Sequence, residues 1–194
     1  MLKLTNYLNS RMMLKSKPVR FSITFIVLFL AFYYFNIGFF SITSPQSSNY
    51  NSFIADNFNY IRVLRHVLLL CTSFLLRCAG FGTVINEYQL LVAGRGGIRL
   101  VYSCLGLGLM SFFAAFVIAY PKAFKRKIAF LVAGLFVIQA LNILRMALVA
   151  LFWTRKAQHI IDNHIIFNGI IYLIIALALY FWVTADDRKK HAKN

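Results

Sequence analysis

The sequence is poor in acidic residues, in charged residues of any kind, and in proline and glycine. Only 5 of its 194 residues are Asp or Glu, 13% are charged, and there are 3 prolines and 10 glycines. A soluble domain has about a quarter of its residues charged, so this composition excludes an ordinary soluble domain. The small numbers of proline and glycine also exclude disordered and fibrous repeat proteins.

Cysteine is equally scarce, with 3 residues at positions 71, 78 and 104. Three thiols cannot all pair, and their spacing matches neither a zinc motif nor a haem motif. We therefore expect no disulfide framework, no metal and no other cofactor. Cys71 and Cys78 are expected to pack as small apolar residues, whereas a chemical role stays open for Cys104.

The sequence is rich in apolar residues and in basic charge. Hydrophobic residues make up 60% of the chain, and 21 Lys and Arg against 5 acidic residues give a formal charge of +16. In a soluble protein this charge suggests nucleic acid, but basic residues that flank apolar segments set the orientation of membrane spans. The sequence therefore predicts an integral membrane protein in contact with membrane lipids, with no nucleic-acid partner.

Four apolar runs have the length of membrane-spanning helices, at residues 21–40, 100–120, 128–153 and 164–183. A helix of about 20 apolar residues spans a bilayer, whereas the apolar region of a cleaved signal peptide has only about 7–15. Residues 1–20, 121–127 and the C-terminal tail are rich in Lys and Arg, and 41–59 contains neither. Because basic loops stay inside, we expect a multi-pass protein of the cytoplasmic membrane with both termini in the cytoplasm.

Residues 60–86 carry a basic stripe rather than a continuous apolar run. On a helical wheel its polar positions fall within about 120° of each other, and they are Arg62, Arg65, His66, Ser73 and Arg77. A helix of this type lies in the membrane interface with its arginines toward the headgroups. The alternative is five or six crossings in total, with these arginines buried in protein.

A short hairpin is predicted next, because two β-prone runs in 89–102 flank a turn rich in glycine. Together with Arg95 and Arg99 of this hairpin, Arg62, Arg65 and Arg77 are expected to form a solvated outer surface; the alternative is a surface that binds anionic headgroups or an envelope polymer. The expected fold is an all-α, polytopic membrane bundle of four full spans, with one interfacial or re-entrant amphipathic helix and the short outer hairpin. We expect a single membrane domain over 1–194 with an N-terminal anchor span at 21–40.

Three residues near the outer ends of the predicted spans have functional chemistry. Arg145 lies in an apolar helix with no acidic residue from 112 to 153, and burying a charge there costs at least about 2.5 kcal/mol. Its partner must come from another helix, from carbonyl groups or from a substrate. Cys104 begins the third span, where the helix dipole favours a thiolate, and His164 begins the last span. Nucleophile, cation and acid–base group are the parts that thiol acyl transfer needs.

With these residues in their motifs, the chain resembles the exosortase/archaeosortase family of membrane transpeptidases. That family is known by a Cys in an Ala-Cys-Ser-Gly-like motif, an Arg in an Asn-x-x-Arg motif, and a downstream His. The present chain has Ser103-Cys104-Leu105-Gly106, then Asn142-Ile143-Leu144-Arg145, then His164. The resemblance covers about residues 85–183, the expected catalytic core. The chain departs from the family pattern at Leu105, where the family usually has Ser.

The resemblance implies a cysteine transpeptidase or protease whose active site faces the outside. Its substrates would be proteins with a C-terminal sorting signal, made of a short motif, a transmembrane helix and a basic tail. It implies that Cys104 is the nucleophile, that Arg145 stabilises the oxyanion, and that His164 transfers protons. Three further residues are expected to assist, namely Asn142 by hydrogen-bonding Arg145 or the substrate, Gly106 by close helix approach and Asp162 by orienting His164.

Two other classes of function stay open. A non-enzymatic membrane subunit of an envelope assembly or export complex would pair Arg145 with an acidic residue of its partner and would not need Cys104. A small transporter is disfavoured, because the predicted spans contain no Asp or Glu for proton coupling. The sequence also contains neither His-Glu-x-x-His nor Gly-x-Ser, so metal-dependent and serine intramembrane proteases are excluded. The oligomeric state is not indicated.

Overall fold

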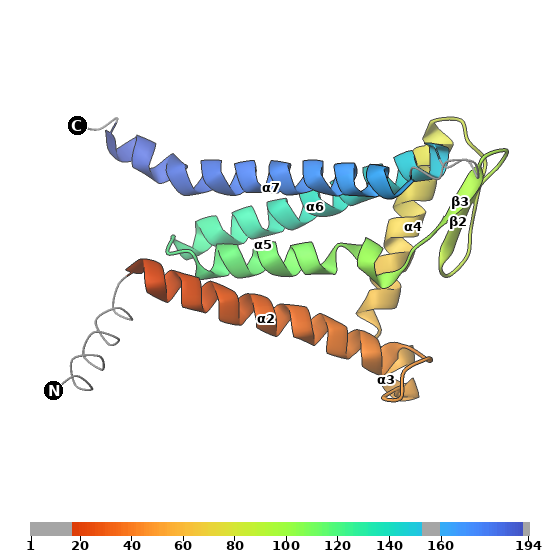
Figure 1. The fold of residues 1–194 in the computed structure, drawn as a ribbon, viewed down its shortest axis with the longest axis horizontal. Helices are drawn as coiled ribbons and strands as arrows, with labels where there is room; N and C mark the ends of the chain where they lie inside the picture. Colours follow the sequence, from red (N-terminus) through yellow and green to blue (C-terminus); the bar gives the residue numbers. More distant parts are fainter. Residues whose placement is uncertain (1–16, 153–159, 192–194) are drawn as a thin grey trace. The chain divides into compact units, whose positions relative to one another are not determined.

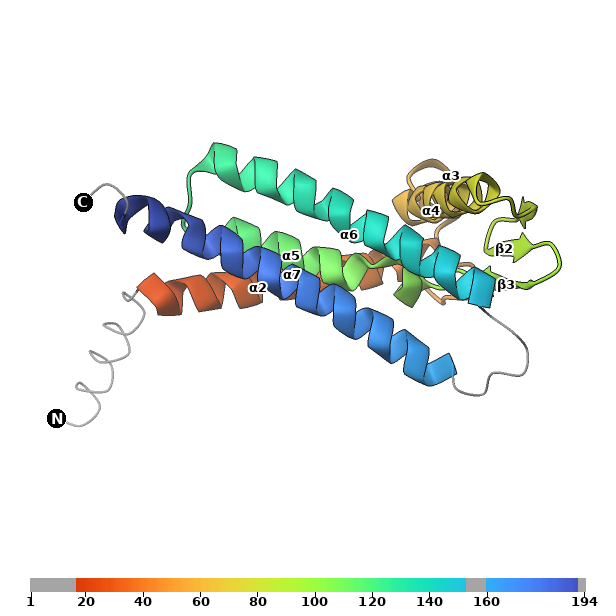
Figure 2. The ribbon, with the colours of Figure 1, turned by 90° about the horizontal axis from the view of Figure 1, so that it is seen from above.

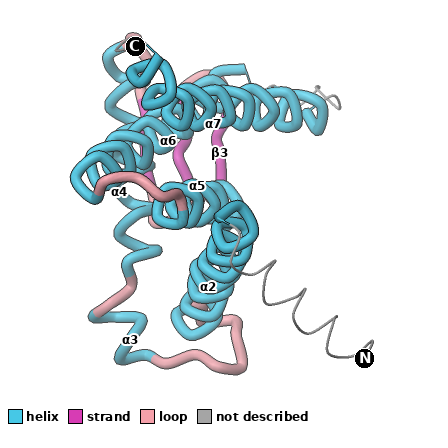
Figure 3. Tube along the Cα trace, turned by 90° about the vertical axis from the view of Figure 1, so that its left-hand side faces the viewer, coloured by secondary structure: helices cyan, strands magenta, loops and turns pink. Residues whose placement is uncertain are grey.

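The structure, a computed structural model, describes residues 17–152 and 160–191, and the side chains of 18–152 and 168–185. Helices make up 75% of it, and three short strands form a small sheet (Figures 1 and 3). The chain divides into two compact units, residues 1–63 with 106–137 and residues 64–105 with 138–194. The all-α membrane bundle expected from the sequence is confirmed.

An aromatic seam joins two helices of the first unit, α2 (Lys17–Thr43) and α5 (Leu107–Ala119). The aromatic residues of each helix recur at every fourth position and therefore share one face. Edge-to-face ring pairs of this type stabilise a contact beyond the area that they bury. Ring centroids lie 5.3–6.0 Å apart, with planes 74–89° to each other, between Phe21, Phe25 and Phe29 of α2 and Phe112, Phe116 and Tyr120 of α5.

A polar cluster adds specific contacts to this seam. Asn36 Nδ2 donates to Ser111 Oγ at 3.1 Å, and the hydroxyl of Tyr60, the first residue of α4 (Tyr60–Cys78), donates to Asn36 Oδ1. The link from α2 to α4 contains the short helix α3 (Ser52–Asn57), whose N-cap Asn51 accepts from the N–H of Ile54. Because buried polar groups need partners, this cluster fixes how α2 meets α5 and the start of α4.

The first part of α6 (Phe124–Phe152) packs against α5 through a glycine. A Cβ atom added at Gly134 would overlap the ring of Phe113, which is 2% exposed. Glycine is therefore required at this position for the two helices to approach each other, as small residues allow in membrane proteins.

The second unit contains most of α4, a small sheet, the last part of α6, and α7 (Ile160–His191). The sheet is antiparallel in the order β1-β2-β3, from β1 (Thr83–Ile85), β2 (Gln89–Val92) and β3 (Gly96–Arg99). The predicted hairpin is confirmed as β2 and β3, and Gly94 in its turn has a positive φ of 71°. The pairing of β1 with β2 was not predicted from the sequence.

Within the described residues, three helices are long and apolar enough to cross a membrane, namely Pro18–Thr43, Phe124–Phe152 and Asn168–Ala185. The fourth predicted span, 100–120, contains the shorter apolar helix α5 of 13 residues. At 1.5 Å per residue α5 is about 20 Å long, less than the hydrocarbon thickness of about 30 Å. The difference arises because α5 begins at Leu107 rather than near Leu100, after a turn that ends at Gly106.

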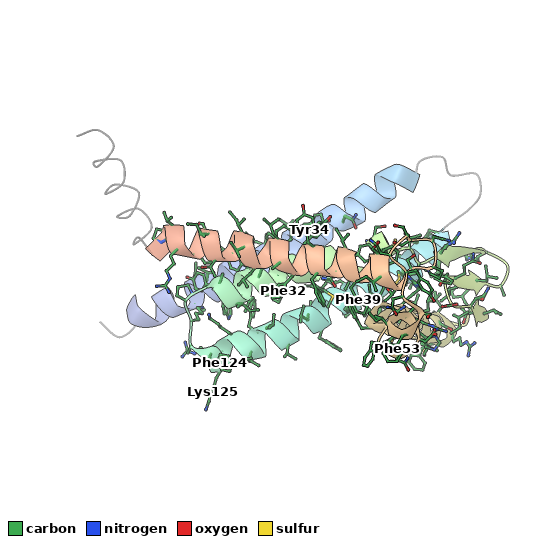
Figure 4. The ribbon with its side chains drawn as sticks, turned by 90° about the horizontal axis from the view of Figure 1, so that it is seen from below. Phe32, Tyr34, Phe39, Phe53, Phe124 and Lys125 are labelled. Atoms are coloured by element: carbon green, nitrogen blue, oxygen red, sulfur yellow. The ribbon has the colours of Figure 1, made fainter. Side chains whose placement is uncertain are left out.

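Large apolar side chains face outward along these helices. None of the apolar window of α2 is buried, and Tyr34 of α2 and Phe53 of α3 are 64% and 67% exposed (Figure 4). A soluble protein rarely exposes so much contiguous apolar surface. Lipid is the environment that such a surface fits.

Replacing Gly134 by Ala is expected to destabilise the protein. The new methyl group must displace the buried ring of Phe113, and overpacking of this type costs about 1–3 kcal/mol. The measurement is the thermal unfolding midpoint of the purified full-length protein. The matched control is Gly169→Ala in α7, where a Cβ meets nothing within 4 Å and helix propensity adds up to about 1 kcal/mol of stability. Equal midpoints for the two variants would contradict the close approach of α5 and α6.

Candidate active site

Cys104 lies on a short 3-10 helix, η1 (Tyr102–Leu105), and its N–H donates to the carbonyl of Val101 at 2.9 Å. Its thiol is free and half-buried. The expectation that Cys104 begins the third spanning helix is corrected, because α5 starts three residues later, at Leu107. Gly106 separates the two segments with a φ of 75°. A side chain disfavours that conformation, so Gly106 is needed for its backbone freedom as well as for its small size.

The turn that carries Cys104 leaves two carbonyl groups outside the hydrogen bonds of α5, and two amides of α6 bind them. Asn142 Nδ2 donates to the carbonyl of Cys104 at 2.9 Å, and Gln139 Nε2 donates to the carbonyl of Leu105 at 3.2 Å. The two amides also contact each other, with Asn142 Nδ2 at 3.4 Å from Gln139 Oε1. Asn142 is only 5% exposed, so this contact is sheltered from competing water.

Arg145 lies one turn beyond Asn142 on α6 and binds the neighbouring helix. Its Nη1 donates to Asn168 Oδ1 of α7 at 2.7 Å. The expected partner on another helix is therefore present, and it is a neutral amide. Within the part of the chain that the structure describes, the positive charge of Arg145 has no carboxylate partner. Asn142 Nδ2 is used for the carbonyl of Cys104, and the expected contact of Asn142 with Arg145 or with the substrate stays a prediction.

His164 and Asp162 belong to the first turns of α7, and their side chains lie outside the described residues. The helix backbone nevertheless fixes one relation. Residues four apart share a face of a helix, and Asn168 comes four residues after His164. The position of His164 is thus one turn from the residue that binds Arg145.

These contacts link the predicted site residues into one series of neighbours in space. Cys104 is bound by Asn142, Asn142 is followed by Arg145 one turn along α6, and Arg145 is bound by Asn168. Three residues on α6 correspond to a rise of about 4.5 Å. Motif residues that are 38 positions apart in the sequence, Cys104 and Asn142, are therefore in direct contact.

The residue that replaces the family Ser has a structural role. The side chain of Leu105 is fully buried, at 0% exposed, and its carbonyl accepts the bond from Gln139. Leu105, which follows Cys104, thus contributes core packing through its side chain and a hydrogen-bond acceptor through its backbone, and its side chain makes no hydrogen bond.

Several arginines of the predicted solvated surface have structural contacts instead. Arg65 is 7% exposed, lies 4.5 Å from the ring centroid of Tyr88, and its Nε has no partner within the described residues. Arg77 donates to Thr83, and Arg95 donates to the carbonyl of Leu151 near the end of α6. Arg77 and Arg95 are nevertheless exposed, as expected for a solvated face, whereas the buried position of Arg65 departs from that expectation.

Sequence reasoning missed Gln139 and Asn168. It considered ionisable residues and cysteines within the spans, whereas these two are neutral amides. A usable signal was present, because Gln139 precedes Asn142 by one turn and Asn168 follows His164 by one turn. An amide in an apolar span needs a partner, and positions one turn from motif residues are where that partner is expected.

We expect Asn142→Asp to release the turn that carries Cys104. The substitution keeps the shape of the side chain but replaces the N–H donor by an oxygen that faces the carbonyl of Cys104. Leaving a buried acceptor unpaired costs about 1–3 kcal/mol. In a protein without Cys71 and Cys78, the rate at which a maleimide alkylates Cys104 should rise about tenfold, which corresponds to about 1.4 kcal/mol.

The matched control for this change is Asn57→Asp in α3. Asn57 Nδ2 also donates to a carbonyl at 2.9 Å, that of Phe53, but the contact is exposed. Its loss should leave the alkylation rate of Cys104 unchanged. A rate in Asn142→Asp equal to that of the control would show that Asn142 does not hold the turn.

Comparison with known proteins identifies a family for the chain. No curated protein and no solved structure matches the chain. The family model described as transmembrane exosortase (Exosortase_EpsH) matches residues 12–182. The match begins before α2, so it includes the N-terminal span and α4 as well as the segment that carries the motifs. On this match over most of its length, the chain belongs to the transmembrane exosortase family.

Proposed function

We propose that this protein is a cysteine transpeptidase or protease at the outer face of the cytoplasmic membrane. Its substrates are proteins that end in a sorting signal, with a short motif, a transmembrane helix and a basic tail. Membership of the exosortase family supports a membrane transpeptidase in general. The assignment of Cys104 and Arg145 to its chemistry is supported by the contacts of the site, and that of His164 by the family resemblance and its place one turn before Asn168 on α7.

The observation that carries the proposal is the bond from Asn142 to the carbonyl of Cys104. It fixes the thiol-bearing turn beside α6, one helical turn from an arginine whose charge has no carboxylate partner within the described residues. A free thiol whose turn is bonded to the helix that carries this arginine suits an anionic acyl-transfer intermediate, because preorganised positive charge stabilises developing negative charge.

In the first step, His164 takes the proton of the Cys104 thiol, and the thiolate sulfur attacks the carbonyl carbon of the scissile peptide bond. The π electrons of that carbonyl move to its oxygen, and Arg145 stabilises the resulting oxyanion. Removing one such donor typically lowers the rate by about 10²–10³. Asn168 positions Arg145 by binding one of its nitrogens, which leaves the other N–H groups of the guanidinium for the oxyanion.

In the second step, the oxyanion collapses, the C–N bond breaks, and the imidazolium of His164 returns its proton to the leaving amine. Histidine suits both transfers because it changes charge near neutral pH. A thioester on Cys104 remains. An amine or a water molecule then attacks this thioester, which releases the acyl product and restores the thiol.

The proposed location follows from the charges that flank the spans. With basic segments on the cytoplasmic side, the end of α6 that carries Arg145 and the start of α7 lie at the outer side. A substrate anchored by its own transmembrane helix would present the residues just outside that helix at this level. The scissile bond would therefore reach Cys104 without leaving the membrane surface.

Cys104→Ala is expected to abolish processing of the substrate. The assay is a gel-mobility shift of tagged envelope proteins that end in a helix and a basic tail, in cells with wild-type or variant protein at equal levels. The structure supplies matched controls, since Cys71 and Cys78 are exposed thiols that belong to α4 and not to the η1 turn. Cys71→Ala and Cys78→Ala should process normally. Full processing by Cys104→Ala would instead favour a non-enzymatic subunit that uses Arg145 for docking.

A further inference from the structure

Helix α4 has three different sectors around its axis. With 100° per residue, one sector of about 140° contains the buried residues, namely Ile61, Arg65, Leu68, Leu69, Thr72, Ser73 and Leu76. A second sector carries exposed polar residues, Arg62, His66 and Arg77. The third sector is about 140° wide, apolar and exposed, and consists of Val63, Val67, Leu70, Cys71, Phe74, Leu75 and Cys78.

The buried and polar sides of α4 are tied to the small sheet. Ser73 and Thr83 share a hydrogen bond of 2.7 Å, Arg77 donates to Thr83, and Arg65 lies over the ring of Tyr88. The apolar sector lies on the other side of the helix, where Phe74 is 71% exposed. One side of α4 thus contacts the sheet, and its apolar side is exposed.

The direction of α4 differs from that of the spanning helices in its own unit. Figure 1 shows α4 running across the direction of α7 and of the last part of α6, and Figure 2, turned by 90°, shows α4 nearly along its own axis. Both α6 and α7 contain segments apolar and long enough to cross a membrane. If these helices follow the membrane normal, α4 lies along the membrane plane.

We propose that the apolar sector of α4 is embedded in the lipid of one leaflet, on the side of the membrane where Cys104 lies. An amphipathic helix in this position places its apolar side about 5–10 Å into the boundary between headgroups and acyl chains. The adjacent polar sector is positively charged and contains no acid, which complements the phosphates of the headgroups, while Arg77 of this sector also donates to Thr83. The alternative occupants are a second copy of the chain or another protein.

In this placement, α4 would position the small sheet and the turn that carries Cys104 relative to the membrane surface. The β-meander follows α4 directly, and β3 is followed by the turn that carries Cys104. A helix held at the lipid surface and bonded to this sheet would fix the depth of Cys104 in the membrane. The lipid contact itself does not depend on the chemistry of Cys104.

The two native cysteines in the apolar sector allow a direct test. Full-length protein with Cys71 or Cys78 as its single cysteine is labelled with bimane and placed in phosphatidylcholine nanodiscs, with or without bromine on the acyl chains. We expect the brominated lipid to quench about half or more of the fluorescence at both positions, because an interfacial helix reaches the acyl region. The matched control is His66→Cys in the polar sector, where quenching should be about a tenth or less.

Two results would overturn the proposal. Bimane on Cys71 that brominated lipid leaves unquenched, together with rapid labelling of Cys71 by a membrane-impermeant maleimide, would show that the sector faces water. Absence of quenching with slow labelling would show that protein covers the sector. A bis-maleimide crosslink between the Cys71 residues of two molecules would then identify a second copy as the occupant.

Discussion

The arrangement of the active site depends on the need to satisfy two carbonyl groups in an apolar protein. Gly106 stops α5 from extending back over Cys104, so the carbonyls of Cys104 and Leu105 accept no bond from that helix. An unpaired backbone carbonyl is costly where water is absent. The amides of Asn142 and Gln139 supply the missing donors, and in doing so they hold the turn that carries Cys104 against α6.

Helix α6 also positions the guanidinium group of Arg145. A side chain three residues beyond Asn142 lies one turn further along α6, and this is where Arg145 meets Asn168 of α7. A neutral amide orients the guanidinium without neutralising it. Within the described residues, this pairing leaves the positive charge of Arg145 without the carboxylate partner that would cancel it. The two named residues of the Asn-x-x-Arg motif thus lie one turn apart on α6. Asn142 binds the turn that carries Cys104, and Arg145 binds α7.

Much of the fold could be predicted from the sequence, because hydropathy and basic charge are properties of whole segments and do not depend on single contacts. The membrane class, three spans, the amphipathic helix and the hairpin all follow from periodicity and the positions of basic residues. The limits of α5 did not follow, because one residue, Gly106, shortens that helix through its backbone conformation. Gln139 and Asn168 were missed because their roles arise only when separate helices pack together. The exposure of Cys71 and Cys78 likewise depends on which side of α4 the sheet covers.

The most direct test of the central claim is to capture the thioester proposed for Cys104. Hydroxylamine added to membranes with a processed substrate competes as the amine acceptor, and it attacks the acyl carbon of a thioester. Mass spectrometry of the cleaved substrate should then show a C-terminal hydroxamate with wild-type protein and no cleavage with Cys104→Ser. A product that ends only in a carboxylate, at any hydroxylamine concentration, would contradict a covalent intermediate on Cys104 and with it the proposed role of the site.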